Sequence, residues 1–243
     1  MPAPSTRTAP TTTTAQTAQT AQTPPTPPTP PSDTADDAAP RSLRKRAAIL
    51  VAAEQVFLAK GYLGTSMDEV AARSGVSKQT VYAHFGSKET LFVALVSAMT
   101  TTAGDEVHPS DPAAAAATDD PGPYLREYAE RQMAVVLTPR ILALRRLVIG
   151  EVARFPDLAR ALYDSGPARA IESLAATVRS FADRGLLNVP DATEAATMFN
   201  WLVMGGPLNE VMLLGDAVRL NRAEQRRHAA ECVRVFLAAY PPE

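Results

Sequence analysis

Apolar residues recur at helical spacing from about residue 42 onward, and glycines and prolines divide this pattern into segments. The first expected helix spans 42–60, and its apolar face consists of Ile49, Leu50, Ala53, Val56 and Phe57. Gly61 follows Lys60, a combination typical of a helix C-terminus. The sequence therefore predicts that an amphipathic helix opens the folded part of the chain.

The next segment carries the signals of short, closely connected helices. These are expected over 67–73, 78–85 and 88–102. Ser66 and Glu69 fit a capping box, in which the Ser66 hydroxyl accepts from the Glu69 amide and the Glu69 carboxylate returns to Ser66. Gly75 suits a tight turn, and Ser77 can cap the helix that follows. This arrangement is typical of a helix-turn-helix from about Ser66 to Phe85.

Helical patterns continue to the C-terminus, and no alternating strand pattern competes with them. A connection rich in Pro and Gly is expected over 103–123, with a helical turn near Ala113–Ala117. The later helices are expected over 124–137, 139–155, 157–163, 167–185, 191–214 and 222–239. We expect a kink in the helix over 191–214, because Gly205-Gly206-Pro207 interrupts it. The predicted fold class is all-α.

Residues 1–40 contain Ala-Gln-Thr and Pro-Pro-Thr repeats that cannot bury apolar area, so a disordered tail is predicted. A solubilising extension is the preferred interpretation, ahead of a ligand for proline-binding modules. No run of about 18 apolar residues and no signal peptide is found, so a cytoplasmic protein without a membrane span is expected. Cys232 is the single cysteine, which excludes an internal disulfide. Its helical context favours a buried, inert thiol over a redox sensor.

One face of the predicted helix-turn-helix is apolar and the other is polar. The expected buried set is Val70, Ala71, Val76, Val81 and Phe85, with Phe57 beneath it. The side chains that then point outward from the helix over 78–85 are Lys78, Gln79, Thr80, Tyr82 and Ala83. Gln79 can pair with adenine through two hydrogen bonds, and Thr80 can meet a base edge. Tyr82 and Lys78 suit phosphate oxygens, which position a protein on DNA without reading sequence.

The charge distribution points to the same region, although the net charge of the chain is only −2. Residues 41–90 hold eight Lys and Arg against four Asp and Glu, a local charge of +4. Arg44, Lys45 and Arg46 fall in the first turn of the first expected helix, and Lys88 opens the fourth. Such cations oppose the helix macrodipole at about 0.3–1 kcal/mol each, and docked phosphates would reverse that cost. This favours DNA contacts over an ordinary solvated face.

Residues 44–95 resemble the DNA-binding region of the TetR family of repressors nearly position by position. The matching positions are Ala52-Ala53, Phe57, Gly61-Tyr62, Thr65–Ala71, Ser74–Glu89 and Leu91-Phe92. Met67 departs mildly, because the family often has Ile or Val there. The resemblance implies a three-helix helix-turn-helix DNA-binding domain over 41–90 and a larger helical ligand-binding and dimerisation domain over 91–243.

The resemblance also implies roles for individual residues. The implied base-reading residues are Lys78, Gln79, Thr80 and Ala83. Together with the cap and charge patterns, it gives candidate phosphate contacts at Arg44, Arg46, Thr65, Ser77, Tyr82, His84 and Lys88. For His84, packing into the domain and contact with DNA are weighted equally.

The C-terminal half is similar, more loosely, to the AefR-like branch of the family, through Arg145–Glu151 and Phe155–Ala159. Arg145 and Glu151 are candidates for polar groups of a pocket, although capping or bridging of helices is the preferred interpretation. Asn200, Trp201 and Met204 lie in a segment that is apolar nearly all round and are further candidates for a pocket. The competing interpretation is a core tryptophan beside a satisfied asparagine.

The sequence therefore predicts a TetR-like regulator of transcription, expected to act as a repressor. The expected partners are double-stranded DNA with a near-palindromic operator, a second copy of the chain and a small-molecule effector that causes release. The alternative is a helix-turn-helix regulator without a small-molecule ligand, controlled by abundance or by a protein partner. An enzyme is not expected, because no metal-ligand cluster, nucleophile elbow or phosphate-binding glycine loop is found, and no cofactor is predicted.

Overall fold

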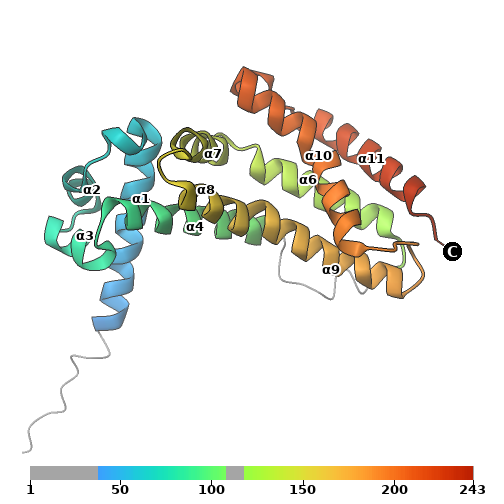
Figure 1. Ribbon diagram of the computed structural model, residues 1–243, viewed down its shortest axis with the longest axis horizontal. Coiled ribbons are helices and arrows are strands. Elements are labelled where there is room, and N and C mark those ends of the chain that lie inside the picture. Colours follow the sequence, from blue (N-terminus) through green and yellow to red (C-terminus); the bar gives the residue numbers. More distant parts are fainter. Residues whose placement is uncertain (1–37, 108–117, 243) are drawn as a thin grey trace, which may run out of the picture.

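A computed structural model of the chain describes residues 38–107 and 118–242. Every regular element within these residues is helical, so the all-α prediction is confirmed (Figure 1). The elements, in chain order, are α1 (Ala38–Gly64), α2 (Met67–Ser74), α3 (Lys78–Phe85), α4 (Lys88–Val107), α6 (Pro121–Val136), α7 (Pro139–Glu151), α8 (Pro156–Tyr163), a π-helical turn (Asp164–Ala168), α9 (Arg169–Asp183), α10 (Ala192–Leu214), a 3-10 turn (Asp216–Val218) and α11 (Arg222–Ala239). The predicted tail over 1–40 and the expected turn near Ala113–Ala117 fall almost wholly outside the described residues.

Helix α1 is longer than the sequence pattern predicts, because it begins at Ala38 rather than near residue 42. Gly61 interrupts it with φ 73° and ψ 176°, a conformation that favours glycine, so the expected helix end is found at that residue. The longer N-terminal part changes the position of Arg44, Lys45 and Arg46. They lie beyond the first turn, so the expectation that they oppose the macrodipole there is wrong.

The predicted capping box before α2 forms only in part. The Ser66 hydroxyl accepts a hydrogen bond from the Glu69 amide at 3.2 Å, as expected. The Glu69 carboxylate instead accepts from Lys60 Nζ at 2.7 Å, and these interactions hold the pKa of Glu69 below its usual range. The carboxylate thereby ties α2 to the end of α1 rather than closing on Ser66.

Two connections in the C-terminal part differ from the expected ones, whereas α10 has its expected extent. Helix α4 continues to Val107 and α6 starts at Pro121, so the connection between them is shorter than the expected 103–123 segment. A π-helical turn joins α8 to α9, where the sequence indicates only a Gly-Pro break. Helix α10 continues as one element through Pro207 to Leu214, across the interruption at which we expected a kink.

The helices form two lobes, each with its own hydrophobic core (Figure 1). The first core joins α1–α4 to α7 and α8, and its buried members include Phe57, Val81, Phe92, Leu144 and Leu158. The second core lies among α6, α9, α10 and α11, with Tyr128, Phe181, Phe199 and Phe236 among its buried residues. Helices α7 and α8 therefore pack with the first lobe, although α6, which belongs to the second core, precedes them in the chain.

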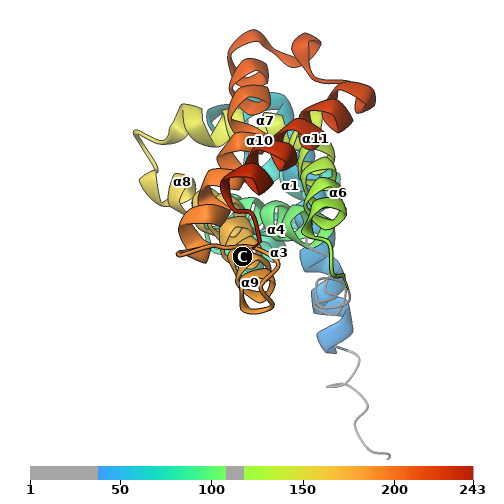
Figure 2. The same cartoon turned by 90° about the vertical axis from the view of Figure 1, so that its right-hand side faces the viewer.

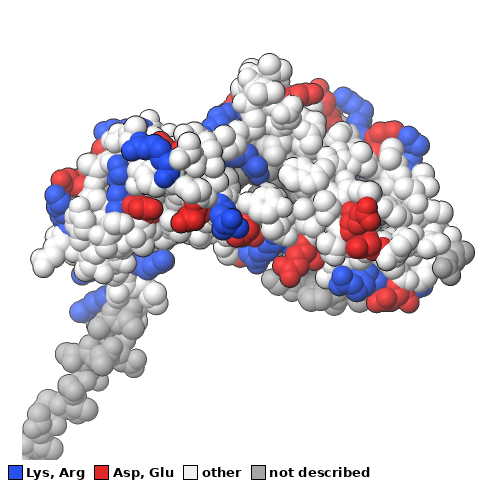
Figure 3. All heavy atoms as spheres, viewed as in Figure 1, with Lys and Arg blue, Asp and Glu red and all other residues white. Residues whose placement is uncertain are grey.

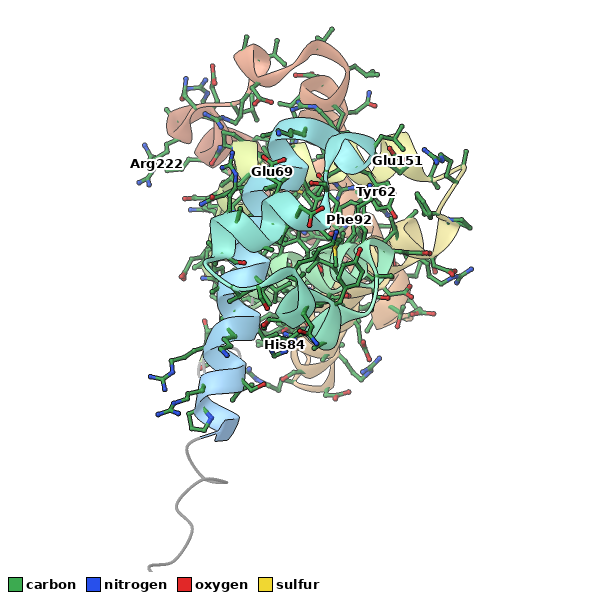
Figure 4. All side chains as sticks on the ribbon, turned by 90° about the vertical axis from the view of Figure 1, so that its left-hand side faces the viewer. Tyr62, Glu69, His84, Phe92, Glu151 and Arg222 are labelled. Carbon is green, nitrogen blue, oxygen red and sulfur yellow. The ribbon has the colours of Figure 1, made fainter. Side chains whose placement is uncertain are left out.

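Aromatic rings connect the end of α1 to α4 and to the start of α8. Phe57 stacks on Phe92 with ring centroids 4.7 Å apart, and Tyr62 lies 5.3 Å from Phe92. Tyr62 also contacts Phe155, the residue before α8, at 4.6 Å. Figure 4 shows Tyr62 and Phe92 in the middle of this lobe. Such pairs contribute about 0.5–1.5 kcal/mol each beyond their buried area, so they fix the helices against one another.

By length and composition alone, Pro40–Gly64 could cross a membrane, which the sequence pattern did not indicate. One third of the apolar 18-residue stretch within this helix is buried inside the protein. Its inward residues, among them Ile49, Val56 and Phe57, pack in the first core. The helix therefore has the character of a core helix with one apolar face.

Candidate DNA-binding surface and internal cavity

Helices α2 and α3 form the predicted helix-turn-helix. Gly75 adopts a left-handed conformation with φ 69°, and its amide donates to the carbonyl of Ala71, which ends α2. Ser77 then caps α3 by accepting from the Thr80 amide at 3.1 Å. The inward face is the predicted one, with Val70, Ala71, Val81 and Phe85 buried and Val76 partly buried. This packing fixes which side of α3 faces outward.

The outward side of α3 carries the predicted base-reading residues. Lys78, Gln79 and Ala83 are exposed, and Thr80 is half-buried. Tyr82 is 43% exposed, which is unusual for a large aromatic residue and leaves its hydroxyl available. The helix therefore presents a short row of polar side chains on a convex surface, which matches the shape of a DNA major groove.

Two polar groups on this surface already have partners within the protein. Lys78 Nζ lies 2.9 Å from an Asp68 carboxylate oxygen, and this pair raises the pKa of Lys78. The hydroxyl groups of Ser77 and Thr80 are 2.8 Å apart and share a hydrogen bond. Both pairs are exposed, so a DNA phosphate or base can replace them at low cost.

Lys88 and Thr65 have structural roles that the sequence argument did not foresee. Lys88 Nζ donates to the carbonyl oxygens of Tyr62 at 2.8 Å and Thr65 at 3.0 Å, and it lies 4.5 Å from the centroid of the Tyr62 ring. Its charge therefore stabilises the C-terminal end of α1, so a phosphate is not needed to explain it. Thr65 is 3% exposed, and its hydroxyl donates to the Gly61 carbonyl at 2.8 Å.

The other candidate phosphate contacts lie at the edge of the helix-turn-helix. Arg44 and Arg46 are exposed on α1, and the Arg46 guanidinium lies 5.3 Å from the centroid of the Phe85 ring. His84 is half-buried, with its ring 6.2 Å from that of Phe85. Figure 4 shows His84 at the outer edge of α3, and Figure 3 shows basic side chains on this lobe interspersed with acidic ones.

A cavity lies between the two cores, with about 690 Å³ of empty space when its open mouth is included. Its lining comes from α4, α6, α7, α8, the π-helical turn, α9 and α10: Thr100, Ala103, Gly104, Val107, Gln132, Val136, Ile141, Arg145, Leu162, Gly166, Pro167, Ala170, Asn200, Trp201, Met204 and Leu208. The mostly apolar wall with a few polar groups is typical of a small-molecule site.

The structure brings all four predicted pocket candidates to this cavity. Asn200 is 2% exposed and accepts from Gln132 Nε2 at 2.7 Å, so the satisfied asparagine of the competing interpretation is also present. Trp201 lines the cavity but is 44% exposed, so it is not a core tryptophan. Among the described residues no carboxylate pairs with Arg145, which therefore does not bridge helices as preferred. Glu151 lies outside the lining.

Sequence reasoning missed Gln132, which is 3% exposed and has an unpartnered Oε1 atom. The residue was detectable, because it lies seven positions after Leu125 and four after Tyr128, on the apolar stripe of α6. A glutamine on such a stripe indicates a buried polar contact. Its partner on α10 follows 68 residues later, so no local pattern identifies the pair.

Other chemistry is limited in the part of the chain that the structure describes. No group of three or more His, Cys, Asp or Glu side chains that could hold a metal ion occurs there. Cys232 is buried, and burial raises the pKa of its thiol to about 11. The thiol is therefore protonated near neutral pH, as expected for an inert cysteine.

Comparison with known proteins identifies both parts of the chain. A family model described as bacterial regulatory proteins of the tetR family matches residues 49–95, and one described as the C-terminal domain of AefR-like transcriptional repressors matches 123–242. A crystal structure of a TetR-family regulator from Mesorhizobium loti is 38% identical, with a TM-score of 0.78, over 82% of this chain and 98% of that one. The chain belongs to the TetR family of bacterial transcriptional regulators. It is therefore a DNA-binding regulator and not an enzyme.

Other relatives of this TetR family regulator include both an activator and a repressor. The flavonoid-responsive regulator FrrA is 32% identical, with a TM-score of 0.69, over 82% of this chain and 98% of its own. The activator FasR of Mycolicibacterium smegmatis is 47% identical over 57 residues, and the repressor BepR of Brucella suis is 41% identical over 51. The match to FasR spans 24% of this chain and only 26% of FasR. The match to BepR spans 21% of this chain and only 24% of BepR.

Proposed function

We propose that this regulator is a repressor that binds a near-palindromic operator as a homodimer and is released by a small molecule bound in the cavity. The observation that carries the proposal is the position of the cavity. It lies between the core that supports α3 and the core that holds α10 and α11, and its wall includes α4 and α7 from the first of these. A ligand there contacts both lobes at once.

The exposed side of α3 supports the DNA-binding step. We assign base reading to Lys78, Gln79, Thr80 and Ala83, with Thr80 meeting a base edge through its methyl group or its hydroxyl. The proposed phosphate contacts are Arg44, Arg46, Ser77, Tyr82 and His84, all of which are exposed or half-buried. Lys88 and Thr65 act by holding the end of α1 in place.

The outer surface of α10 and α11 supports the dimer. The two helices lie next to each other at the edge of the larger lobe (Figure 2). Large apolar side chains exposed on them are Met198, Trp201, Leu202, Leu213, Leu214 and Val235. A Cβ atom added at Gly205 or Gly206 would meet nothing within 4 Å, so this part of α10 allows close approach of another helix. A second copy of the chain would bury this apolar surface.

The switching step follows from preferential binding to one arrangement of the two lobes. A ligand that fits the cavity better when the two recognition helices are displaced shifts the population away from the DNA-bound form. FrrA, whose name states that it responds to flavonoids, supports an effector that is a small organic molecule. The AefR-like family description supports repression, while the matches to the repressor BepR and the activator FasR are equally short and favour neither direction. Cytoplasmic location follows, because the operator is there.

The test is selection of bound duplexes from a random pool, followed by sedimentation of the complex. We expect a near-palindrome with half-site centres about 10–10.5 base pairs apart, or a multiple of this, and two chains for each duplex. Gln79→Ala protein serves as the matched control, because it should lose preference at one position in each half-site. One chain per duplex with a single half-site would contradict the dimer, and the absence of any enriched sequence would contradict base reading.

A further inference from the structure

The described wall of the cavity has few polar side chains, and only one of them is charged. Arg145 is the only charged side chain among the lining residues that the structure describes, and no carboxylate lies in the wall. The remaining polar side chains are neutral: Thr100, Gln132, Asn200 and the Trp201 indole. The cavity is therefore an apolar enclosure with one fixed positive charge.

The Arg145 side chain is partly buried and has no anionic partner among the described residues. Its Nε atom is buried and has no hydrogen-bond partner, and no described residue forms an ion pair with it. Burial alone lowers the pKa of Arg145. The next residue, Arg146, differs in this respect, because its guanidinium donates to Asp216 at 2.8 Å. A partly buried cation without a paired anion is costly to the folded protein, so an anion that enters the cavity removes part of an existing penalty.

A second unpaired atom in the cavity is the acceptor Gln132 Oε1, which needs a hydrogen-bond donor. Gln132 donates through Nε2 to Asn200, which fixes the orientation of its amide and leaves Oε1 buried without a donor. The Thr100 hydroxyl cannot supply one, because it donates to the Val96 carbonyl at 2.7 Å. The cavity therefore offers one positive donor and one neutral acceptor on an otherwise apolar wall.

We propose that the effector is a largely apolar organic acid, whose ionised oxygen pairs with Arg145 and whose hydroxyl or N–H group donates to Gln132 Oε1. This proposal rests on the proposed function and specifies the chemistry of its ligand. Arg145 then determines specificity, because a neutral molecule of the same shape leaves the guanidinium unpaired, whereas an amine adds a second positive charge beside it.

Trp201 gives a direct measurement of binding. It is the only tryptophan of the chain and lines the cavity, so its fluorescence reports on occupancy of this site. The probes are 4′-hydroxybiphenyl-4-carboxylate, the same acid without its hydroxyl group, and the neutral 4′-hydroxybiphenyl-4-carboxamide. We expect the hydroxy acid to bind about tenfold to a hundredfold more tightly than the amide. Loss of the hydroxyl should weaken binding by about twofold to tenfold.

The matched variants are Arg145→Gln and Arg160→Gln, the second of which removes the same charge from an exposed position on α8. Arg145→Gln should remove the preference for acid over amide while leaving amide binding unchanged. Arg160→Gln should retain the wild-type preference. The thermal midpoint without ligand should not fall in Arg145→Gln, because an unpaired buried charge is lost.

The outcomes separate the two proposals. Equal binding of acid and amide would overturn the ligand class, and an acid preference that survives Arg145→Gln would overturn the role of Arg145. If the amide then releases the operator duplex, control by a ligand stands and only the class is wrong. Failure of all three probes to change Trp201 fluorescence would also overturn the class. If, in addition, a broad set of amines and neutral compounds leaves DNA binding unchanged, control by a small molecule is overturned as well.

Discussion

Polar side chains of the DNA-binding surface have hydrogen-bond or ion-pair partners within the protein, whereas two polar atoms of the cavity have none among the described residues. On the DNA-binding surface Lys78 pairs with Asp68, and Ser77 shares a hydrogen bond with Thr80. In the cavity Arg145 Nε and Gln132 Oε1 have no partner. DNA therefore exchanges contacts that already exist, with a strong dependence on salt, whereas a cavity ligand supplies contacts that are missing. The DNA-binding surface can therefore bind a polyanion by exchanging partners, whereas the cavity selects a small molecule with complementary polar groups.

A further difference lies in how the two regions are supported. The DNA-binding surface rests on the first core, whose aromatic residues Phe57, Tyr62 and Phe92 hold α1 against α4. The cavity has no core of its own, because its wall is formed where the two cores meet. We therefore expect the DNA-binding surface to be rigid and the spacing between the lobes to be the variable that a ligand changes.

The largest expected effect comes from opening the first core with Phe57→Ala. Phe57 is fully buried, so the loss should be about 3–5 kcal/mol of unfolding free energy. Thermal unfolding should be followed both by far-UV circular dichroism and by Trp201 fluorescence, which reports on the other lobe. We expect both midpoints to fall together, because α4, α7 and α8 join the lobes.

The matched variant for the second core is Phe199→Ala, which removes an equally buried ring. It should also lower both midpoints. If instead Phe57→Ala lowers the circular dichroism midpoint and leaves the Trp201 fluorescence midpoint unchanged, the lobes unfold separately. Coupling between the cavity and the DNA-binding surface would then need another explanation.

Lys88→Met tests whether this cation acts within the protein or on DNA. The substitution removes two charged hydrogen bonds and the contact with the Tyr62 ring, so unfolding free energy should fall by about 1.5–3 kcal/mol. The salt dependence of DNA binding by the folded protein should not change. Arg44→Met should behave in the reverse way, with unchanged stability and a salt slope lower by about 1. A reduced slope in Lys88→Met would restore Lys88 as a phosphate contact.

Gln79→Ala and Tyr82→Ala separate base reading from phosphate contact on α3. Gln79→Ala should cost about 1–3 kcal/mol on the selected operator and relax preference at one position in each half-site. Tyr82→Ala should weaken binding to all duplexes alike, because phosphates carry no sequence information. Fluorescence anisotropy at fixed salt measures both. Equal loss on every duplex in Gln79→Ala would remove it from the base-reading set.

The smallest effect is expected at the ion pair between α1 and α7. Arg140 Nη2 donates to Glu54 at 2.8 Å, and Arg140 Nε makes a second bond to the same carboxylate. The Arg140 side chain is 48% exposed, so Arg140→Ala should cost at most about 1 kcal/mol of stability. A double-mutant cycle with Glu54→Gln measures the coupling. A coupling energy well above this would mean that the pair, and not apolar packing alone, holds α7 against α1.

Much of the DNA-binding region was predictable because its signals are local. Ser66, Gly75 and Ser77 act on residues within four positions of themselves, and the buried face of α2 and α3 follows from helical spacing. Lys88 was misinterpreted for the same reason. Its partners Tyr62 and Thr65 lie 26 and 23 residues earlier, beyond the reach of any pattern along one helix.

The sequence alone determined the fold class, the position of the helix-turn-helix and the face of α3 that points outward, because caps, turns and helical periodicity are short-range properties. Asn200, Trp201, Met204 and Arg145 were predicted as candidates for a ligand pocket. Only the tertiary structure decided that they meet Gln132 around a single cavity and that Arg145 is left without an anion. Their encounter depends on how two cores pack across α4 and α7, and this packing is a long-range property of the whole chain.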